Sequence, residues 1–521
     1  MLVQDFLEAS AIQAPDKVAL VFEEQRLSYA ELSRRASRMA GGLWAAGGRP
    51  RDRVAIFLEN SIEAVVAVFG VLKAGATFSL INPSTKAEKL AFTLRDERPA
   101  ALIAAGDALH GAVAASALQL VPIQLVVWVG ATRHGVPPAG TVWQDFDTLA
   151  AHIGDAPADP CASEEDLSTI IYTSGSTGKP KGVMSTHANV VFAATSISTF
   201  LGITAEDRIF CALPLSFDYG LYQLIMSVRA GATLVLERGF VFPVRALEIM
   251  RRERVTGFPG VPTMFAMLLS LKDLSAFDLS SLRFVTNTAA ALPVSHIAAL
   301  RAALPHVMLF SMYGLTECKR VSYLPPGELD RRPGSVGIAI PGTRVDVVDD
   351  NGNSLPRGQV GELVVRGPHV MRGYWERPEE TARRFRQDRK TGERVLYTGD
   401  LFRLDLDGFL YFVGRRDDML KTRGEKVSPK EIEDVLTAMD GVLEAAVLGV
   451  PDPMLGDAVC VFVVPKPGAT VTASAIRSYC AAHLEDFMLP KHIQVVESLP
   501  RGGSGKIDKE QLRMCVASSA V

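Results

Sequence analysis

Apolar runs of strand length alternate with segments of helical periodicity through much of the chain, and this alternation is the strongest constraint on the fold. Residues 53–57, 101–105, 125–129, 233–237 and 282–286 are short runs of the type found in buried strands. Residues 61–75 have helical periodicity and end at Gly75, and residues 31–43 place on one helical face Leu32, Ala36, Met39, Ala40 and Leu43. The alternation predicts α/β layers with helices packed on largely parallel sheets.

The pattern changes after about residue 335. Residues 344–356, 361–367 and 401–414 look like strands joined by turns, with Asn351-Gly352 and Asp407-Gly408 as turn signals. A charged stretch then passes into a helical segment and two further strand-like runs. We therefore predict a large domain over 1–416, whose part from about 335 to 416 is β-rich, and a small α+β domain over 417–521.

Composition excludes several classes of function. The 521 residues carry a formal net charge of −3, with 48% hydrophobic and 22% charged residues, which disfavours disorder and nucleic-acid binding. No uncharged apolar run reaches membrane-spanning length, and the N-terminal residues do not resemble a signal peptide. The six cysteines are scattered without metal-ligand spacing. We expect a cytoplasmic protein without membrane insertion.

The segment Tyr172–Gly182, YTSGSTGKPKG, has the composition of a phosphate-binding loop. A Walker loop requires G-x-x-x-x-G-K-[ST], but Gly175 and Gly178 are three residues apart and Lys179 precedes Pro180. Pro180 supplies neither a hydroxyl nor a backbone N–H, so a Walker site is excluded. The candidate phosphate ligands of this loop are Thr173, Ser174, Gly175, Ser176, Thr177, Gly178, Lys179 and Lys181.

The same segment resembles the signature loop of the AMP-forming adenylating superfamily, which includes acyl-CoA synthetases, peptide-synthetase adenylation domains and firefly-type luciferases. The resemblance spans nearly the whole chain and implies a large N-terminal domain, a mobile C-terminal domain, and acyl-AMP formation. Further similar segments occur in the order typical of the family: LSYAEL (27–32), LKAGA (72–76), YGLTE (313–317), GELVVRGPHVMRGYW (361–375), YTGDL (397–401), GRRDDMLKTRGEKVSP (414–429) and LPRGGSGKID (499–508).

The resemblance implies roles for individual residues in ATP binding. Tyr313 would stack on adenine, Thr316 would contact a phosphate, and Glu317 would bind Mg²⁺, which prefers oxygen ligands. Asp400 would accept hydrogen bonds from the ribose hydroxyls, and Arg415 would contact the ribose or a phosphate. The remaining implied residues are Gly314 beside the nucleotide and a wall between adenine and acyl group at Ala289, Ala290 and Ala291.

Three further residues are implied in catalysis and domain motion. Lys506 corresponds to the lysine that bridges the substrate carboxylate and the α-phosphate during adenylation. Asp417 corresponds to the hinge about which the small domain rotates, and Gly424 would line the channel for the incoming thiol. Such a rotation would let one site serve two successive reactions.

The acyl pocket departs from the patterns of the family. Phe217, Asp218 and Tyr219 occupy the region that closes on the acyl group, and in amino-acid-activating domains a Phe-Asp pair binds the substrate ammonium. An unpaired buried carboxylate is unfavourable, so Asp218 calls for a cation. Lys319 or Arg320 could pair with Asp218, bind a second carboxylate or polar group of the substrate, or lie on a solvated helix face.

The leading interpretation is an acid–CoA ligase that uses ATP, Mg²⁺ and CoA on a small carboxylic acid. The alternative is a stand-alone adenylation enzyme that loads an amino acid or other acid onto the phosphopantetheine of a carrier protein. Leu315 in YGLTE favours the first and Asp218 the second. A luciferase-like oxygenase is a third alternative that no residue favours. The acid and the oligomeric state stay open.

Overall fold

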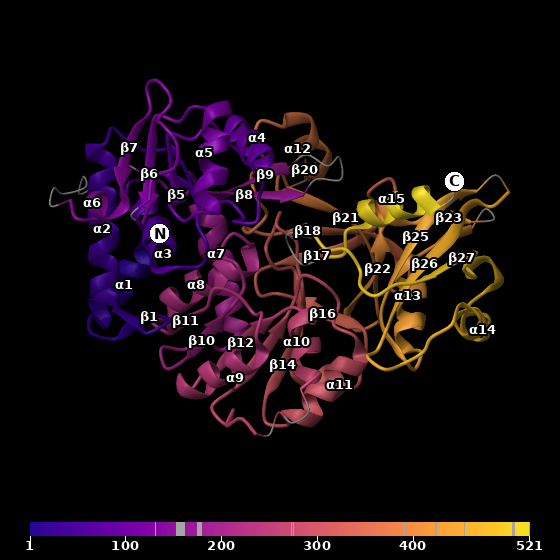
Figure 1. The fold of residues 1–521 in the computed structure, drawn as a ribbon. Coiled ribbons are helices and arrows are strands. Elements are labelled where there is room, and N and C mark those ends of the chain that lie inside the picture. The colour runs from indigo at the N-terminus through magenta and orange to yellow at the C-terminus, as the bar shows by residue number, and fades with distance from the viewer. Residues whose placement is uncertain are drawn as a thin grey trace.

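The computed structural model describes residues 1–519 except 131, 153–161, 175–179, 272–273, 275, 389–390, 423–424, 453 and 503–505. Within this part of the chain, three sheets of fourteen, eight and five strands organise the fold. The two larger sheets belong to the indigo-to-orange part of the chain, and the five-stranded sheet forms a yellow lobe on the right of Figure 1. The predicted α/β class, with a large N-terminal and a small C-terminal part, is confirmed.

The fourteen-stranded sheet combines a parallel part with an antiparallel part. The strands β10, β12, β13 and β14 are neighbours and run parallel, so their carboxyl ends meet at one edge. In spatial order the strands are β17 (Arg344–Val348), β18 (Val360–Arg366), β21 (Arg394–Leu404), β22 (Leu410–Arg415), β16 (Ser335–Ala339), β15 (Ser322–Leu324), β14 (Met308–Tyr313), β13 (Phe284–Asn287), β12 (Gly257–Gly260), β10 (Arg208–Cys211), β11 (Thr233–Leu236), β1 (Val18–Phe22) and β2 (Gln25–Ser28), with β20 (Phe385–Gln387) beside β21.

The eight-stranded sheet contains the strands that flank the signature loop. Here β8 and β9 pair in antiparallel fashion, so the loop 175–179 between them joins two strands, whereas a Walker loop leads into a helix. The loop residues themselves lie outside the described part. The spatial order is β19 (Gly373–Tyr374), β9 (Pro180–Thr186), β8 (Leu167–Ser174), β4 (Thr77–Leu80), β3 (Arg53–Phe57), β5 (Ala101–Ala105), β6 (Leu125–Val129) and β7 (Val142–Asp145).

Helices fill the space between the two large sheets. Helix α7 packs on β8 and β9 and on α8, which packs in turn on β10 and β11. Helix α3 is buried except at Glu63 and Lys73, and its other residues are apolar, as expected of a helix between two layers. The helices of this part are α1 (Asp5–Gln13), α2 (Tyr29–Ala45), α3 (Ile62–Lys73), α4 (Ala87–Glu97), α5 (His110–Leu120), α6 (Phe146–Ala150), α7 (His187–Leu201), α8 (Asp218–Ala230), α9 (Pro243–Arg252), α10 (Pro262–Leu269), α11 (Val294–Ala303), η1 (Pro326–Glu328) and α12 (Pro378–Arg384).

The C-terminal lobe begins after a short 3₁₀ turn, η2 (Arg416–Asp418). It has cores of its own on the two faces of its sheet, one under α13 and α14 and one under α15. The division at Arg416/Asp417 stays a prediction that agrees with this change of sheet. The elements of the lobe are β23 (Leu420–Thr422), β24 (Glu425–Val427), α13 (Pro429–Ala438), β25 (Val442–Asp452), β26 (Gly456–Pro465), α14 (Ala473–His483), η3 (Asp486–Met488), β27 (His492–Val495) and α15 (Lys509–Ser519).

None of the described helices combines the length and the apolar character needed to cross a bilayer. The carboxyl of Glu97, at the end of α4, is buried in the large part of the molecule. Its Oε2 accepts a hydrogen bond of 2.7 Å from Ser79, and its Oε1 has no hydrogen-bond partner among the described residues. Burial raises the pKa of Glu97 to about 7, against the partial opposition of Ser79 and Arg53.

Replacing Glu97 with glutamine is expected to stabilise the protein at alkaline pH. The pKa of Glu97 is higher in the folded than in the unfolded chain, so its stabilising contribution is complete below about pH 4 and is lost as the pH rises through about 7. At pH 8 the Glu97→Gln variant should gain up to about 3 kcal/mol in the free energy of unfolding, with little gain at pH 5. Urea unfolding at the two pH values measures this, with the exposed Glu88→Gln of the same helix as control. An equal difference at both pH values would contradict the assignment.

Candidate active site

The carboxyl ends of three parallel strands bring the predicted nucleotide and acyl residues together. Strand β10 leads through a short loop to Asp218 at the start of α8, β13 leads to Ala289, and β14 ends at Tyr313. The hydroxyl of Tyr219 on α8 bonds to the Thr286 carbonyl oxygen at 2.9 Å, which ties the acyl segment to β13. Ala289 has a φ of +75°, an uncommon conformation for a residue with a side chain.

The turn after β14 is unusually tight. A Cβ atom added to Gly314 would lie 2.1 Å from the carbonyl oxygen of Lys319, so only glycine fits this close approach. Lys319 itself has a φ of +61°. Strained backbone of this kind persists where the surrounding structure holds it, and it clusters at functional sites. The turn thereby fixes the directions of the side chains from Thr316 to Arg320.

Tyr313 and Asp400, the residues predicted to contact adenine and ribose, are in direct contact. The Tyr313 hydroxyl donates a hydrogen bond of 2.5 Å to Oδ2 of Asp400. Arg415 pairs with Asp400 across the ladder of β21 and β22, with 3.4 Å between Nε and Oδ1. Burial raises the pKa of Asp400 above its usual range, while Arg415 and Tyr313 oppose the shift. The structure thus joins three predicted nucleotide residues that lie far apart in sequence.

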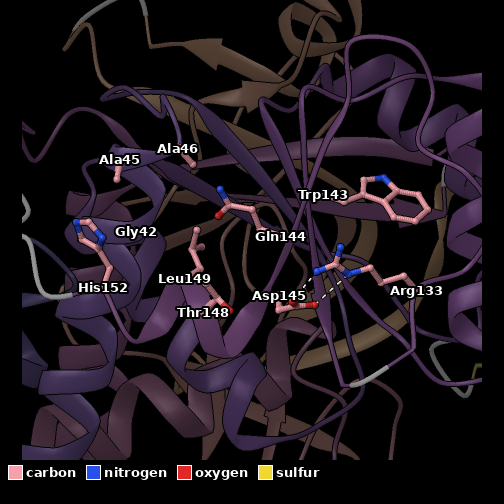
Figure 2. A pocket seen from close by; sticks show the side chains of 10 residues that line it. All are labelled: Gly42, Ala45, Ala46, Arg133, Trp143, Gln144, Asp145, Thr148, Leu149 and His152. Atoms are coloured by element: carbon pink, nitrogen blue, oxygen red, sulfur yellow. Dashed lines mark hydrogen bonds and ion pairs between the residues drawn. The ribbon is translucent and has the colours of Figure 1, made fainter.

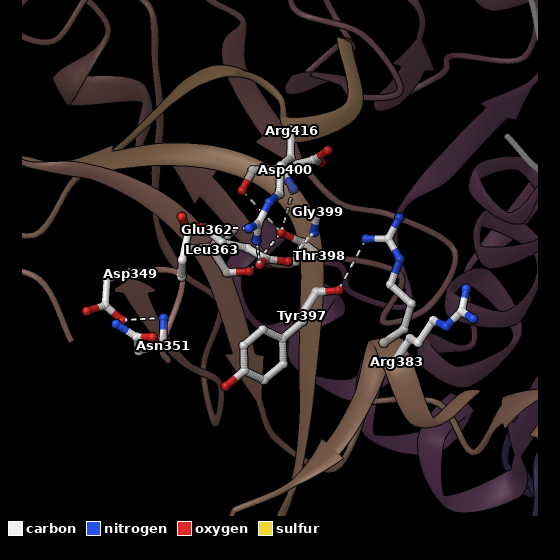
Figure 3. Close-up of polar contacts among 12 residues, drawn as sticks. Asp349, Asn351, Glu362, Leu363, Arg383, Tyr397, Thr398, Gly399, Asp400 and Arg416 are labelled. Atoms are coloured by element: carbon white, nitrogen blue, oxygen red, sulfur yellow. Dashed lines mark hydrogen bonds and ion pairs between the residues drawn. The ribbon is translucent and has the colours of Figure 1, made fainter. Parts of the chain in front are cut away.

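A buried glutamate connects the Asp400 segment with the start of the C-terminal lobe (Figure 3). Glu362 accepts a hydrogen bond from the Gly399 backbone N–H and one from the Arg416 guanidinium, each 2.9 Å long. Gly399 has a φ of +71°, a left-handed conformation that favours glycine. Glu362 therefore holds the backbone beside Asp400 and the residue before the predicted hinge.

Glu317, the residue predicted to bind Mg²⁺, has one carboxylate oxygen held by a tyrosine. Its Oε1 accepts a hydrogen bond of 2.6 Å from the Tyr374 hydroxyl, which leaves Oε2 free of hydrogen bonds to described residues. No cluster of three or more acidic, histidine or cysteine side chains suited to a metal occurs in the described part of the chain. A single carboxylate completed by phosphate and water oxygens fits the preference of Mg²⁺, which is bound without an all-protein cage.

Replacing Tyr374 with phenylalanine tests how Glu317 is held. Loss of the hydroxyl removes one hydrogen bond to a carboxylate and frees the Glu317 side chain to change rotamer. We expect the Mg²⁺ concentration needed for half-maximal pyrophosphate exchange to rise roughly tenfold, with little change in the amount of folded protein. A Tyr397→Phe variant is the control, since this ring lies on β21 of the fourteen-stranded sheet beside Arg386 and makes no hydrogen bond to Glu317 in the described structure. An unchanged Mg²⁺ requirement in Tyr374→Phe would contradict the role.

Lys506 reaches this site from the C-terminal lobe. Its ammonium interacts electrostatically with the carboxylates of Asp218, Glu317 and Asp400, all on the large part of the molecule. Lys506 as a whole residue is exposed, but surrounding protein partly desolvates its ammonium. This desolvation, followed by repulsion from Arg415, lowers the pKa of Lys506. The lobe is therefore oriented with the predicted catalytic lysine at the predicted reaction centre.

The signature loop is described only at its two ends. Thr173 is half-buried in β8, while Gly175, Ser176, Thr177, Gly178 and Lys179 lie outside the described residues, as does the side chain of Ser174. Lys181 forms an ion pair with Glu380, and its Nζ lies 5.8 Å from the centroid of the Tyr374 ring. Lys181 is thus adjacent to the tyrosine that holds Glu317.

Lys319 and Arg320 are both buried beside the acyl segment, each with 4% of its surface exposed. The hypothesis of a solvated helix face is wrong, because the tight turn places them inside. The alternative of an ion pair with Asp218 is not formed either: Asp218 is half-buried and makes no ion pair with either residue in the described structure. Burial lowers the pKa of both cations, while the nearby Asp218 carboxylate opposes the shift.

The two cations rest on aromatic rings. Lys319 Nζ lies 5.7 Å from the Tyr222 ring centroid, and Arg320 Cζ lies 5.1 Å from that of Tyr219. Cation–π contacts contribute roughly 0.5–2 kcal/mol, whereas taking one ion out of water costs roughly several kcal/mol. The rings therefore offset only part of the desolvation of Lys319 and Arg320.

The structure also shows which residues sequence reasoning missed. Glu362 and Tyr374 both lie within the family-like segment 361–375, but their roles depend on contacts with Gly399, Arg416 and Glu317. Among the predicted residues, Thr316 is half-buried, Asp417 is exposed in η2, and Gly424 lies outside the described residues.

A separate pocket of about 340 Å³ lies away from these residues (Figure 2). It is formed by the end of α2, by β7 and by α6, and an ion pair between Arg133 and Asp145 lies at its wall. None of the predicted site residues lines it. This pocket is therefore separate from the candidate active site at the strand ends.

Comparisons with known proteins agree with the geometry. The family model for AMP-binding enzymes matches residues 7–375, and that for their C-terminal domain matches residues 431–506. A feruloyl-CoA synthase of Amycolatopsis is 32% identical over 96% of both chains, and a long-chain-fatty-acid–CoA ligase of Salmonella typhimurium is 31% identical over 98% of this chain and 93% of its own.

The fold comparison leads to the same group. The crystal structure of ATP-bound MatB from Rhodopseudomonas palustris superposes with a TM-score of 0.87 at 31% identity, covering 99% of each chain. Family enzymes use ATP with Mg²⁺ and CoA, for which the residues around Glu317, Asp400 and Lys506 are suited. The chain therefore belongs to the family of AMP-binding enzymes, and within it to the AMP-forming ligases that join a carboxylic acid to CoA.

Proposed function

We propose that the site at the carboxyl ends of β10, β13 and β14 converts a carboxylic acid and ATP into an acyl-AMP, and that the acyl group then passes to CoA. The observation that supports this most strongly is the position of Lys506. A lysine of the C-terminal lobe shares one electrostatic environment with Glu317, Asp400 and Asp218 of the large part. A lysine placed among three carboxylates is expected at a reaction centre. It is not expected of a lysine in a solvated C-terminal tail.

In the first reaction a carboxylate oxygen attacks the α-phosphorus of ATP, and the bond to the β-phosphate oxygen breaks to release pyrophosphate. Two anions must approach each other, so positioned cations lower the barrier. Lys506 binds the attacking carboxylate and the α-phosphate, and Asp400 and Arg415 hold the ribose. Glu317 would hold Mg²⁺, which would supply neutralisation of the phosphate charge, and the segment 173–181 would hold the β- and γ-phosphates.

In the second reaction the sulfur of CoA attacks the acyl carbonyl, AMP leaves, and the thiol proton passes to solvent. In the present orientation Lys506 interacts electrostatically with Asp218, Glu317 and Asp400, so we infer that the thiol needs a different arrangement of the lobe. Asp417 is the proposed hinge, and the exposed position of η2 leaves its backbone free to turn. Gly424 is the proposed lining of the thiol channel.

The identity of the acid is not set by family membership, because relatives of similar identity are named for ferulic acid and for long-chain fatty acids. Transfer to a carrier-protein phosphopantetheine is the alternative second step, and Asp218 is the residue that favours an amino acid. Both alternatives share the first reaction.

Pyrophosphate exchange tests the proposal directly. Fatty, aromatic, dicarboxylic and amino acids are each supplied with ATP and Mg²⁺, and CoA or a phosphopantetheinylated carrier protein is then added to the best acid. Exchange that depends on an acid, followed by an acyl-CoA detected by mass spectrometry, supports the proposal. Acyl transfer to the carrier protein and not to CoA would show that the second reaction uses the carrier protein. If no acid supported exchange, the proposed adenylation reaction would be rejected.

A further inference from the structure

Two consecutive buried cations stand beside the acyl segment without an anion. Lys319 Nζ and Arg320 Nε have no hydrogen-bond partner among the described residues, and neither side chain forms an ion pair there. Lysine and arginine are almost never this buried unless they are paired. The large part of the molecule therefore contains a buried cationic site with which no described residue forms an ion pair.

The location of this site relates it to the acyl group. Lys319 and Arg320 follow Glu317 directly in the turn after β14, and they rest on Tyr222 and Tyr219 of α8. Tyr219 is fixed to β13 through Thr286, three residues before Ala289. The cations thus lie between α8 and the strand ends where the reacting carboxylate must be placed.

Two further polar atoms of α8 and of the loop before it also lack partners. The Tyr222 hydroxyl on α8 and the Ser216 hydroxyl in the preceding loop are buried without a hydrogen bond in the described structure. Asp218 is the carboxylate that acts electrostatically on both cations, and it acts on Lys506 as well. Glu317 also acts on Lys319, and its charge is counted toward the Mg²⁺ that it is predicted to hold. Lys319, Arg320 and Asp218 then leave one positive charge, which one additional monoanion would neutralise.

We propose that Lys319 and Arg320 bind a second anionic group, a carboxylate, on the acid that this enzyme activates, so that its substrate is a dicarboxylic acid. One carboxylate of the substrate meets Lys506 and ATP, and the other meets the cations at the tyrosines of α8. The inference rests on the proposed function. A site built to pair a buried charge rejects an analogue without that charge, because the buried groups are then left unpaired.

The test compares matched acids in pyrophosphate exchange with the full-length enzyme: hexanoate with adipate, octanoate with suberate, and benzoate with phthalate. We expect at least one diacid to exceed its monoacid by about tenfold or more in kcat/KM. Arg320→Met and Lys319→Met should each lower kcat/KM for that diacid by about 100-fold, mainly through KM, so that the ratio of diacid to monoacid kcat/KM falls. Arg320→Lys keeps the charge and should retain more of the diacid activity than Arg320→Met.

A matched control is available at the other end of α8. Arg229 also rests on an aromatic ring, 6.0 Å from the Phe6 centroid, and donates to Thr195. Arg229→Met should leave the ratio of diacid to monoacid unchanged. Thermal unfolding gives a second readout: Lys319→Met and Arg320→Met should each raise Tm, because an unpaired buried charge is removed.

Other outcomes overturn the inference. Equal loss of activity with both members of a pair, together with a lower Tm, would assign Lys319 and Arg320 a structural role. A preference for the monoacid would also overturn the inference while leaving the ligase function intact. So would a preference for leucine over 4-methylpentanoate that is lost in Asp218→Asn, because Asp218 would then bind a substrate ammonium. If no acid of any class supports exchange, the proposed function fails first and the inference with it.

Discussion

Replacing Lys506 with methionine should lower acid-dependent pyrophosphate exchange by about a thousandfold. Removal of one group that stabilises developing charge in a preorganised site commonly reduces the rate by about 10²–10³-fold. The Lys506 ammonium interacts with Asp218, Glu317 and Asp400, so its loss removes the positive charge that lets carboxylate and α-phosphate approach. The measurement is exchange at saturating ATP with the best acid of the panel.

The second half-reaction separates this role from general damage to the protein. Synthetic acyl-AMP supplied with CoA should still give acyl-CoA in Lys506→Met at close to the native rate. Lys509→Met is the control, because Lys509 bonds to Glu433 within the lobe, 3.3 Å away. In the native enzyme, exchange should also fall with rising pH before the usual lysine range, since the pKa of Lys506 is lowered and only its ammonium form is active. Equal loss of both half-reactions would reject the assignment.

Replacing Asp417 with proline should block the second half-reaction and spare the first. Asp417 lies in the 3₁₀ turn η2, whose backbone dihedrals proline can adopt, so the present orientation of the lobe is compatible with the substitution. Proline then restricts rotation about φ at the proposed hinge. We expect pyrophosphate exchange within about twofold of native and acyl-CoA formation from acyl-AMP lowered by about 100-fold.

An alanine at the same position tests whether the backbone or the carboxylate matters. Asp417→Ala removes the charge and keeps rotational freedom, so it should form acyl-CoA at nearly the native rate. The two rates are measured in the same preparation, by exchange and by single-turnover thioester formation. If Asp417→Pro lost both half-reactions equally, or lost neither, the hinge would have to lie elsewhere.

Much of the fold and part of the site could be predicted from local patterns. The predicted strands at 53–57, 101–105 and 125–129 are β3, β5 and β6 with the same bounds, because short apolar runs between helices leave few alternatives. Tyr313, Asp400 and Arg415 were named from their motifs, and the structure brings them into contact.

Residues whose roles depend on distant contacts could not be predicted in this way. Glu362 is an ordinary strand glutamate in the sequence, and only its hydrogen bonds to Gly399 and Arg416 relate it to the nucleotide and hinge segments. The role of Tyr374 likewise depends on its hydrogen bond to Glu317, fifty-seven positions earlier in the chain. No local pattern encodes a pairing over such separations.

The sequence by itself determined the α/β layering, the exclusion of a Walker site and the set of motifs, since these follow from side-chain periodicity and from residue types at short spacing. Only the tertiary structure decided the environment of the charges. It buries Lys319 and Arg320 without an anion, leaves Asp218 half-exposed, and brings Lys506 to Glu317 and Asp400. The physical reason is that the energy of a charge depends on the solvent and the charges around it, which are set by segments remote in sequence.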